Sequence, residues 1–345
     1  MLACLLVLSP VSTSTAGVLR IVAYNTYNNP DDTAEDAPFS TIFSAIGNES
    51  VGGIAKRIDV LALAETDTGS SVRLAGVLNG LYDTDAYEIV TSSSVGGDRT
   101  GVLYDSSTLA LLEAADLTHI GVHPILRARF RPVGVTGSGS DFCVYAVHLK
   151  AGLFESDITT RAAEAVALRN DADALGKGAN IIYAGDFNIF NSSEGAWVNM
   201  IVPGNGQAFD TADSPGEWHD NEAFKLLHTR HSSTDMNARL DLMMVSGELL
   251  DGGGFDGGGF DGGAFEYLPD SFHVFGNNGT HTFGAPIGTG TGASPDVLAA
   301  LELASDHLPI VADHRFSPVP EPATASLLAL AGLCLAVSAW RRRRR

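Results

Sequence analysis

The amino-acid sequence predicts an α/β (α+β) fold, a four-layered α-β-β-α sandwich of two mixed sheets flanked by helices. Three observations support this class. Strand-like apolar runs alternate loosely with helical stretches, the helices are too few for a regular parallel α/β repeat, and several strands follow one another directly. Consecutive strands favour antiparallel pairing, and a sheet with a buried face needs another layer against it. Without the two terminal segments about 300 residues remain, enough for one large or two small domains.

Strands are expected where apolar and β-branched residues run together or alternate with polar ones. These are residues 19–24, 60–64, 87–90, 101–104, 127–131, 142–147, 181–184 and 240–245, and the apolar residues 310–312 follow the last polar motif. Helices are predicted for residues 39–56, 72–81 and 159–175, the last with a clear amphipathic pattern. Glycine, proline and asparagine predict turns or loops at residues 28–32, 96–100 and 276–294.

Residues 251–263 are a low-complexity run of Gly, Asp and Phe within the domain predicted to span residues 17–317. Glycine at this density opposes regular structure, so a flexible insertion is expected. The three aspartates recur every five residues, and Ca²⁺ binding through them stays an open alternative.

Both ends of the chain have the composition of targeting signals. Residues 1–16 are predicted to be a signal peptide with small residues before a cleavage site after Ala16, although the basic n-region is missing and the true start codon stays open. At the other end, Pro320-Glu321-Pro322 precede an uncharged helix predicted for residues 323–340 and then five arginines. This order resembles the PEP-CTERM sorting signal over residues 318–345. The resemblance implies export, processing by an exosortase-type enzyme, transient anchoring by the transmembrane helix, and a cell-envelope or matrix destination; a plain tail anchor is the alternative.

The formal net charge of −20 bears on the choice of partner. Such a chain repels polyanions at long range, and apart from the terminal arginine run it has no Lys/Arg-rich segment for tight duplex binding. Of the three cysteines, two lie in the terminal segments, so Cys143 is expected to be a small buried hydrophobe without a disulfide partner.

Polar motifs stand at the ends of five strand-like runs, which is the main functional signal. In chain order they contribute Asn25, Glu65, His148, the pair Asp186 and Asn188, and the pair Asp306 and His307. If these strand ends converge, they form a hard-cation site with acid–base partners, as phosphate-ester hydrolysis requires.

Together these motifs resemble the endonuclease/exonuclease/phosphatase family from about residue 19 to residue 316, with Ala64 where the family usually has Gln. The resemblance implies a two-sheet sandwich and a divalent-metal-dependent phosphoesterase. It assigns Asn25, Glu65 and Asp306 to the metal, which would be Mg²⁺ with Mn²⁺ or Ca²⁺ as alternatives.

The same resemblance implies catalytic roles for five residues. Asp186 would accept a proton from the attacking water, and Asn188 would hold a phosphate oxygen or orient Asp186. His307 would stabilise charge on the phosphate and would be oriented by Asp241. His148 would act as general acid.

Two classes of function are therefore weighed. The first is an exported, nuclease-like hydrolase of phosphodiester or phosphomonoester bonds acting on nucleic acid, phospholipid headgroups or nucleotides, without a stable protein partner. Arg99 and Arg127 are further candidates for phosphate contact or for salt bridging. The second is a non-catalytic matrix or surface protein that keeps the fold. A Ser-based hydrolase is disfavoured because no Gly-x-Ser-x-Gly elbow stands in a strand–helix setting.

Overall fold

The structure is a computed structural model that describes residues 17–27, 36–93, 99–117, 124–135, 138–231, 235–250 and 265–316. The predicted signal peptide, the loop at residues 28–32, the Gly/Asp/Phe insertion, the sorting segment and its helix at residues 323–340 lie outside these ranges, as does most of the turn at residues 96–100. Within the described ranges, no helix has both the length and the apolar character needed to cross a bilayer.

Two large mixed sheets form the centre of the fold. The first has the order β15 (Phe265–Tyr267), β17 (Ile310–Phe316), β1 (Gly17–Asn25), β4 (Val60–Thr66), β6 (Arg99–Asp105) and β5 (Tyr87–Thr91), with β16 (His273–Val274) also pairing with β17. The second has the order β11 (Ala208–Asp210), β14 (Asp241–Ser246), β10 (Asn180–Asp186), β9 (Phe142–His148), β8 (Leu126–Pro132) and β7 (Leu109–Asp116). Each sheet contains one parallel pair, β1 with β4 and β9 with β10, among antiparallel neighbours.

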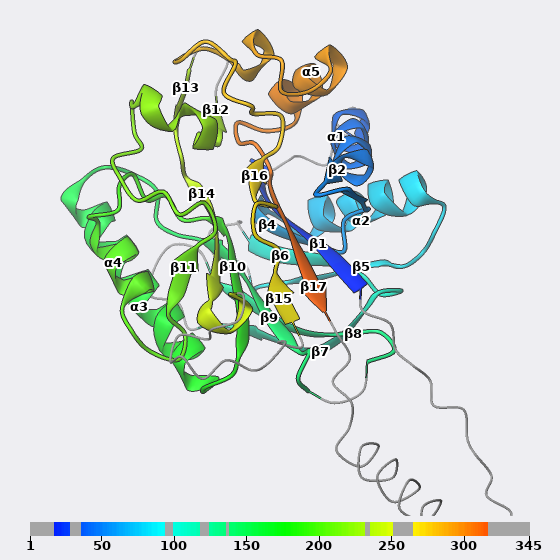
Figure 1. Cartoon of the computed structure of the whole chain (residues 1–345), viewed down its shortest axis with the longest axis vertical. Coiled ribbons are helices and arrows are strands. Elements are labelled where there is room, and N and C mark those ends of the chain that lie inside the picture. The colour runs from blue at the N-terminus through cyan, green and yellow to red at the C-terminus, as the bar shows by residue number, and fades with distance from the viewer. Residues whose placement is uncertain are drawn as a thin grey trace, which may run out of the picture.

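Helices cover the outer faces of both sheets (Figure 1). On one side lie α1 (Asp36–Asn48), α2 (Thr68–Tyr82) and α5 (Pro295–Ala304), and on the other lie α3 (Glu155–Ala174) and α4 (Gly195–Ile201). Strand β9 shows how the layers arise, because successive side chains point to opposite faces. Phe142, Val144 and Ala146 join the core between the sheets. Cys143, Tyr145 and Val147 pack in the cluster that includes α3 and α4 residues, and Cys143 is buried and has no disulfide. The four-layered prediction is confirmed.

The elements differ from the sequence prediction in identifiable places. The helix predicted for residues 39–56 was too long: α1 ends at Asn48, and β2 (Ser50–Val51) and β3 (Ile54–Ala55) follow as a hairpin. Gly52 and Gly53 form its turn at φ values of 56° and 84°, a conformation that a helix cannot use. Strand β7 and helices α4 and α5 were not predicted. For α5 a signal existed, because Ser294 caps the helix by accepting from the Val297 amide and Pro295 stands at its first turn.

Gly185 lies in β10 directly before Asp186, at a position where the neighbouring strand leaves no room for a side chain. It has φ of 142°, and a Cβ added there would lie 2.1 Å from the Val147 carbonyl oxygen of the neighbouring strand. We expect Gly185→Ala to lower the free energy of unfolding by roughly 2 kcal/mol or more, since backbone strain and overpacking add. Gly76→Ala is the matched control, because it lies on an exposed face of α2 with open space and should stabilise by roughly 0.5–1 kcal/mol. Denaturant unfolding curves of both variants test this, and equal midpoints would contradict it.

Candidate active site

The carboxyl ends of β1, β4, β9 and β10 bring most of the predicted site residues to one edge of the sandwich. The prediction was wrong for Asp306 and His307, which do not end a strand but lie between α5 and β17. In the second sheet, Asp186 at the end of β10 lies opposite His148 at the end of parallel β9 and opposite Asp241 at the start of antiparallel β14. In the first sheet, Asn25 ends β1 beside the Ala64–Glu65 end of β4. The parallel pairs therefore place their last residues at one edge, and β14 begins where they end.

One amide joins the two sheets across this edge. Asn25 Nδ2 donates to Glu65 Oε1 and to Asp186 Oδ2, each at 3.0 Å, while Asn25 Oδ1 accepts from the Tyr27 amide at 3.0 Å. The hydroxyl of Ser305 donates to the Asn25 carbonyl oxygen at 2.7 Å and so holds the loop that carries His307. In this arrangement Asn25 turns its NH2 group, not its oxygen, toward the two carboxylates, and a metal contact through Oδ1 would require the amide to rotate.

Glu65, His148 and Asp186 form a compact ligand cluster. Their ligating atoms all lie within 4.8 Å of one another, with His148 Nε2 at 3.7 Å from Glu65 Oε1 and 3.8 Å from Asp186 Oδ2. Asp186 and His148 are buried and Glu65 is partly exposed, so solvent reaches the cluster from the Glu65 side. Burial raises the pKa of Asp186 to about 6, against the opposing effects of the nearby His307 and His148.

Two residues of the site, Glu65 and Asn188, have a left-handed backbone conformation. Glu65 has φ of 47°, at a break in the β4–β6 register between Leu63 and Thr66 that re-aims its side chain. Asn188 has φ of 51°; its amide N–H donates to Asp186 Oδ1 at 2.9 Å and its side chain donates to the Leu149 carbonyl oxygen at 3.0 Å. Asn188 therefore orients Asp186 and ties it to the end of β9. Left-handed conformations at non-glycine residues cost energy and are concentrated at functional sites.

His307 and Asp241 form a buried dyad. His307 Nδ1 lies 2.6 Å from Asp241 Oδ2, and His307 Nε2 lies 3.9 Å from Asp186 Oδ2. Burial alone would lower the pKa of His307, but the charge and hydrogen bond of Asp241, with Asp186 and Asp306, raise it to about 10. His307 is therefore cationic at neutral pH, with its Nε2 edge directed at the carboxylate cluster. The Thr229 hydroxyl accepts from the Asp241 amide at 3.0 Å and fixes the start of β14.

Asp306 lies beside the cluster but not within it. Burial raises its pKa, the His307 cation opposes that rise, and the Glu65 charge adds to it, so Asp306 and Glu65 share one electrostatic environment. Asp306 Oδ1 is buried and accepts no hydrogen bond from any group in the described ranges. A buried carboxylate oxygen without a hydrogen-bond donor is expected where that oxygen binds a cation.

The donor set fits a divalent cation. The carboxylates of Asp186, Asp241 and Asp306 act on the His307 imidazolium, and the Glu65 carboxylate lies near that of Asp186, so the negative charge exceeds the positive. Oxygen donors of this kind suit Mg²⁺ and Mn²⁺.

Other predicted candidates have structural partners elsewhere. Arg127 bridges Glu113 and Asp171 at 2.6 Å each on the outer face of the second sheet, which accounts for it as an ion-pair residue. Arg99 donates to the Ser92 carbonyl oxygen and lies opposite Thr66, directly after Glu65. Thr229 and Arg230 were missed: they lie on and beside the two-residue strand β12 (Arg230–His231), which is too short to give a sequence pattern.

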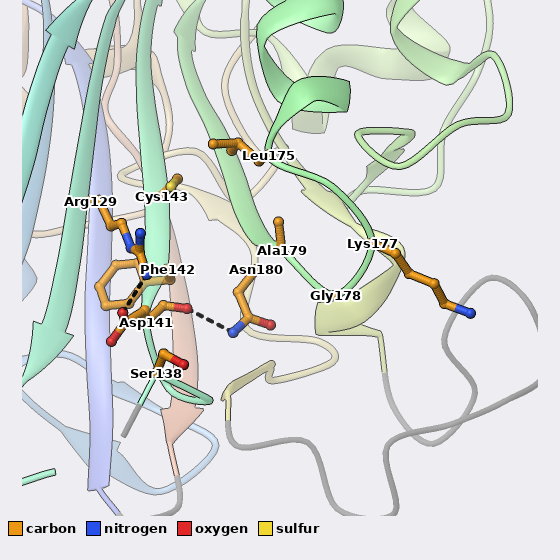
Figure 2. Close-up of a pocket in the computed structure, with 10 residues that line it drawn as sticks. All are labelled: Arg129, Ser138, Asp141, Phe142, Cys143, Leu175, Lys177, Gly178, Ala179 and Asn180. Atoms are coloured by element: carbon orange, nitrogen blue, oxygen red, sulfur yellow. Dashed lines mark hydrogen bonds and ion pairs between the residues drawn. The ribbon is translucent and has the colours of Figure 1, made fainter. Parts of the chain in front are cut away.

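A cavity of about 300 Å³ lies at the opposite end of β9 from His148 (Figure 2). It is lined by residues at the start of β9 and β10, among them Asp141, Cys143 and Asn180, and by Arg129 and Lys177. Arg129 is paired there with Asp141 at 2.7 Å. The cavity is therefore separate from the carboxylate cluster, and none of the predicted site residues lines it.

Comparison with known proteins gives a consistent result. The Endonuclease/Exonuclease/phosphatase family profile matches residues 22–307, and the PEP-CTERM protein-sorting motif matches residues 318–344, which marks the C-terminus as a sorting signal and indicates export. Comparison with curated protein sequences gave no match.

Solved structures share the fold at low sequence identity. An endonuclease/exonuclease/phosphatase family protein from Bacteroides thetaiotaomicron is 15% identical with a TM-score of 0.55, covering 89% of this chain and 97% of that one. The human Nocturnin catalytic domain with bound sulfate anion is 15% identical with a TM-score of 0.54, covering 87% and 95%. A mannosyl-6-phosphatase from Bacteroides thetaiotaomicron is 16% identical with a TM-score of 0.51, covering 86% and 99%. Because the family profile matches residues 22–307, which is most of this chain, the chain belongs to the endonuclease/exonuclease/phosphatase family.

Proposed function

We propose that the protein is an exported, divalent-metal-dependent phosphoesterase that hydrolyses phosphodiester bonds by in-line attack of water. Family membership supports hydrolysis of phosphoesters. The single observation that carries the metal dependence is that the Glu65 and Asp186 carboxylates converge at one strand edge, with ligating atoms within 4.8 Å of each other. Asn25, Glu65 and Asp306 would hold Mg²⁺ or Mn²⁺, with the Asp186 carboxylate alongside. The bound cation would supply charge neutralisation and polarisation of a phosphate oxygen.

The remaining steps follow from the chain's own groups. Asp186, oriented by the Asn188 amide, accepts the proton of the attacking water. His307, held cationic by Asp241, donates from Nε2 to a non-bridging oxygen and stabilises the charge that develops there. His148, whose Nε2 faces the same cluster, gives a proton to the departing oxygen.

Export is proposed to end in processing at the C-terminal segment. The PEP-CTERM match supports cleavage near Pro320-Glu321-Pro322 by an exosortase-type enzyme after transient anchoring by residues 323–340, with release to the envelope or matrix. The net charge of −20 favours small phosphodiesters, nucleotides and lipid headgroups over tightly bound duplex nucleic acid.

Hydrolysis of a substrate panel tests the proposal. We expect the full chain with Mg²⁺ or Mn²⁺ to hydrolyse bis-p-nitrophenyl phosphate, and a chelator to return the rate to the protein-free level, because the excess of buried carboxylates cannot bind an anionic phosphate without a cation. Plasmid DNA, RNA and sphingomyelin in the same panel identify the class of the natural substrate. Absence of turnover on every substrate, together with absence of divalent-cation binding, would instead favour a non-catalytic matrix or surface protein.

A further inference from the structure

Arg230 is a basic residue beside the carboxylate cluster to which no role has been assigned. It begins strand β12, which pairs with β13 (Met236–Ala238), and it forms an isolated antiparallel bridge with His307. The flanking hydrogen bonds run from the His231 amide to the Asp306 carbonyl oxygen and from the Leu308 amide to the Thr229 carbonyl oxygen, both at 2.7 Å. This pattern makes Arg230 and His307 a non-hydrogen-bonded antiparallel pair.

That geometry fixes the direction of the Arg230 side chain. In a non-hydrogen-bonded pair the two Cα atoms are closest, about 4.5 Å apart, and both side chains leave on the same face. His307 directs its ring toward Asp186 and Asp241. Arg230 therefore leaves the strand on the face that carries the candidate active site, next to His307. Its positive charge also acts on Asp306, where it opposes the rise of that carboxyl's pKa.

Arg230 carries a permanent positive charge in a chain that is otherwise strongly acidic. The ion pair that the structure gives Arg230, with Asp235, is long, at 3.8 Å, and the Arg230 side chain is 39% exposed. By contrast, Arg20, Arg161 and Arg239 are fully buried in short ion pairs with Asp313, Glu194 and Asp210. An anion bound beside His307 would lie next to the Arg230 guanidinium.

The charge of Arg230 matters because the site is acidic. An anionic ester that binds there approaches the carboxylates of Glu65, Asp186, Asp241 and Asp306, and Arg230 places a permanent positive charge beside them. Guanidinium groups match phosphate oxygens in geometry and form charge-assisted hydrogen bonds with them.

We propose that Arg230 binds the substrate phosphate at the rim of the active site, beside His307, and thereby sets the affinity of the proposed phosphoesterase for anionic esters. The inference rests on the proposed function, and it deepens that function by making phosphate recognition depend on a half-exposed arginine of the β12–β13 hairpin. Since the guanidinium contacts substrate before and after bond cleavage alike, its removal should raise KM more than it lowers kcat.

Kinetics of Arg230→Gln and Arg230→Lys in the full chain test this. With bis-p-nitrophenyl phosphate and saturating Mn²⁺, we expect Arg230→Gln to raise KM about tenfold or more with kcat within about threefold, as loss of one charge-assisted hydrogen bond predicts. Arg230→Lys should recover part of that loss. Arg129→Gln is the matched control, because Arg129 is 41% exposed and paired with an aspartate at the far end of the second sheet, and its KM should equal that of the wild type.

Calorimetry with inorganic phosphate at saturating Mg²⁺ separates this inference from the proposed function, because it needs no turnover. Tenfold weaker phosphate binding by Arg230→Gln supports the inference even if no ester is hydrolysed. Asp235→Asn removes the acid that pairs with Arg230 and should leave phosphate affinity unchanged or tighter. Wild-type phosphate affinity in Arg230→Gln, no phosphate binding by the wild type, or an equal loss in Asp235→Asn would overturn the inference, the last by showing a structural effect of the hairpin.

Discussion

Replacement of Asp186 by asparagine or alanine is expected to lower kcat/KM for phosphodiester hydrolysis by about 10²–10⁴-fold, the usual loss on removing a general base. Groups from both sheets contact Asp186. The Asn25 side-chain amide and the Asn188 backbone amide donate hydrogen bonds to it. The Nε2 atoms of His148 and His307 lie within 4 Å of its Oδ2. Neither replacement can accept a proton from water. The measurement is the initial rate on bis-p-nitrophenyl phosphate at saturating Mn²⁺.

Stability distinguishes this catalytic loss from unfolding. Burial raises the pKa of Asp186 from its ordinary value to about 6, so at neutral pH the folded state holds an ionised group that it disfavours. Asp186→Asn removes that charge and should leave the metal-free Tm equal or higher. Asp59→Asn is the matched control, because burial likewise raises the pKa of Asp59 to about 6, but Asp59 lies at the other end of β4 and pairs with Lys56 at 3.0 Å. Full activity in Asp186→Ala would end the proposed mechanism.

Loss of His307 should have the second largest effect. His307→Gln is expected to lower kcat by about 10²–10³-fold, as removal of a donor to developing negative charge does in other enzymes. The cause is the dyad: Asp241 Oδ2 holds the ring at 2.6 Å and keeps it cationic. Rates of the variant at saturating substrate test this, and a change confined to KM would contradict a role in the transition state.

The partner variant Asp241→Asn gives a pH signature. Asp241 charge and hydrogen bonding are the largest contributions that raise the pKa of His307 to about 10, so the wild type keeps this cation across the neutral range and loses it only as the pH rises through about 10. In Asp241→Asn the same loss should begin near neutral pH, where an ordinary histidine titrates. We therefore expect the alkaline limb of the kcat profile to move down by two units or more; a limb that stays in place would show that His307 does not act as a cation.

How much of the fold and of the candidate site could be predicted from the sequence depends on the length of each sequence pattern. Long apolar runs that end in polar residues, such as the one before Asp186, predict both a buried strand and a candidate site residue at its end, and the structure brings these strand ends together. Even the dyad of Asp241 and His307, 66 residues apart, was expected, but only because the order of motifs resembled a known family. Periodicity alone does not show which strand ends meet.

The remainder was hidden because its causes are not local. The bulge that re-aims Glu65 arises from the β4–β6 register, which depends on packing between distant strands. Strand β12 has two residues, so Thr229 and Arg230 carry no periodic pattern; their position follows from the bridge to His307. The helix predicted for residues 39–56 ran past its true end because Ile54 kept an apolar spacing while Gly52 and Gly53 made a turn.

A titration with Mn²⁺, followed by calorimetry, tests the central claim most directly: that distant strand ends form one divalent-cation site. We predict saturable binding of Mn²⁺ to the wild-type chain, weakened at least tenfold in Glu65→Gln, which removes a carboxylate charge but keeps the side-chain size and the acceptor for Asn25. Asp171→Asn, which alters an acid on α3 that is paired with Arg127, should bind as the wild type does. Identical Mn²⁺ affinity in wild type and Glu65→Gln, or no binding by either, would contradict the account.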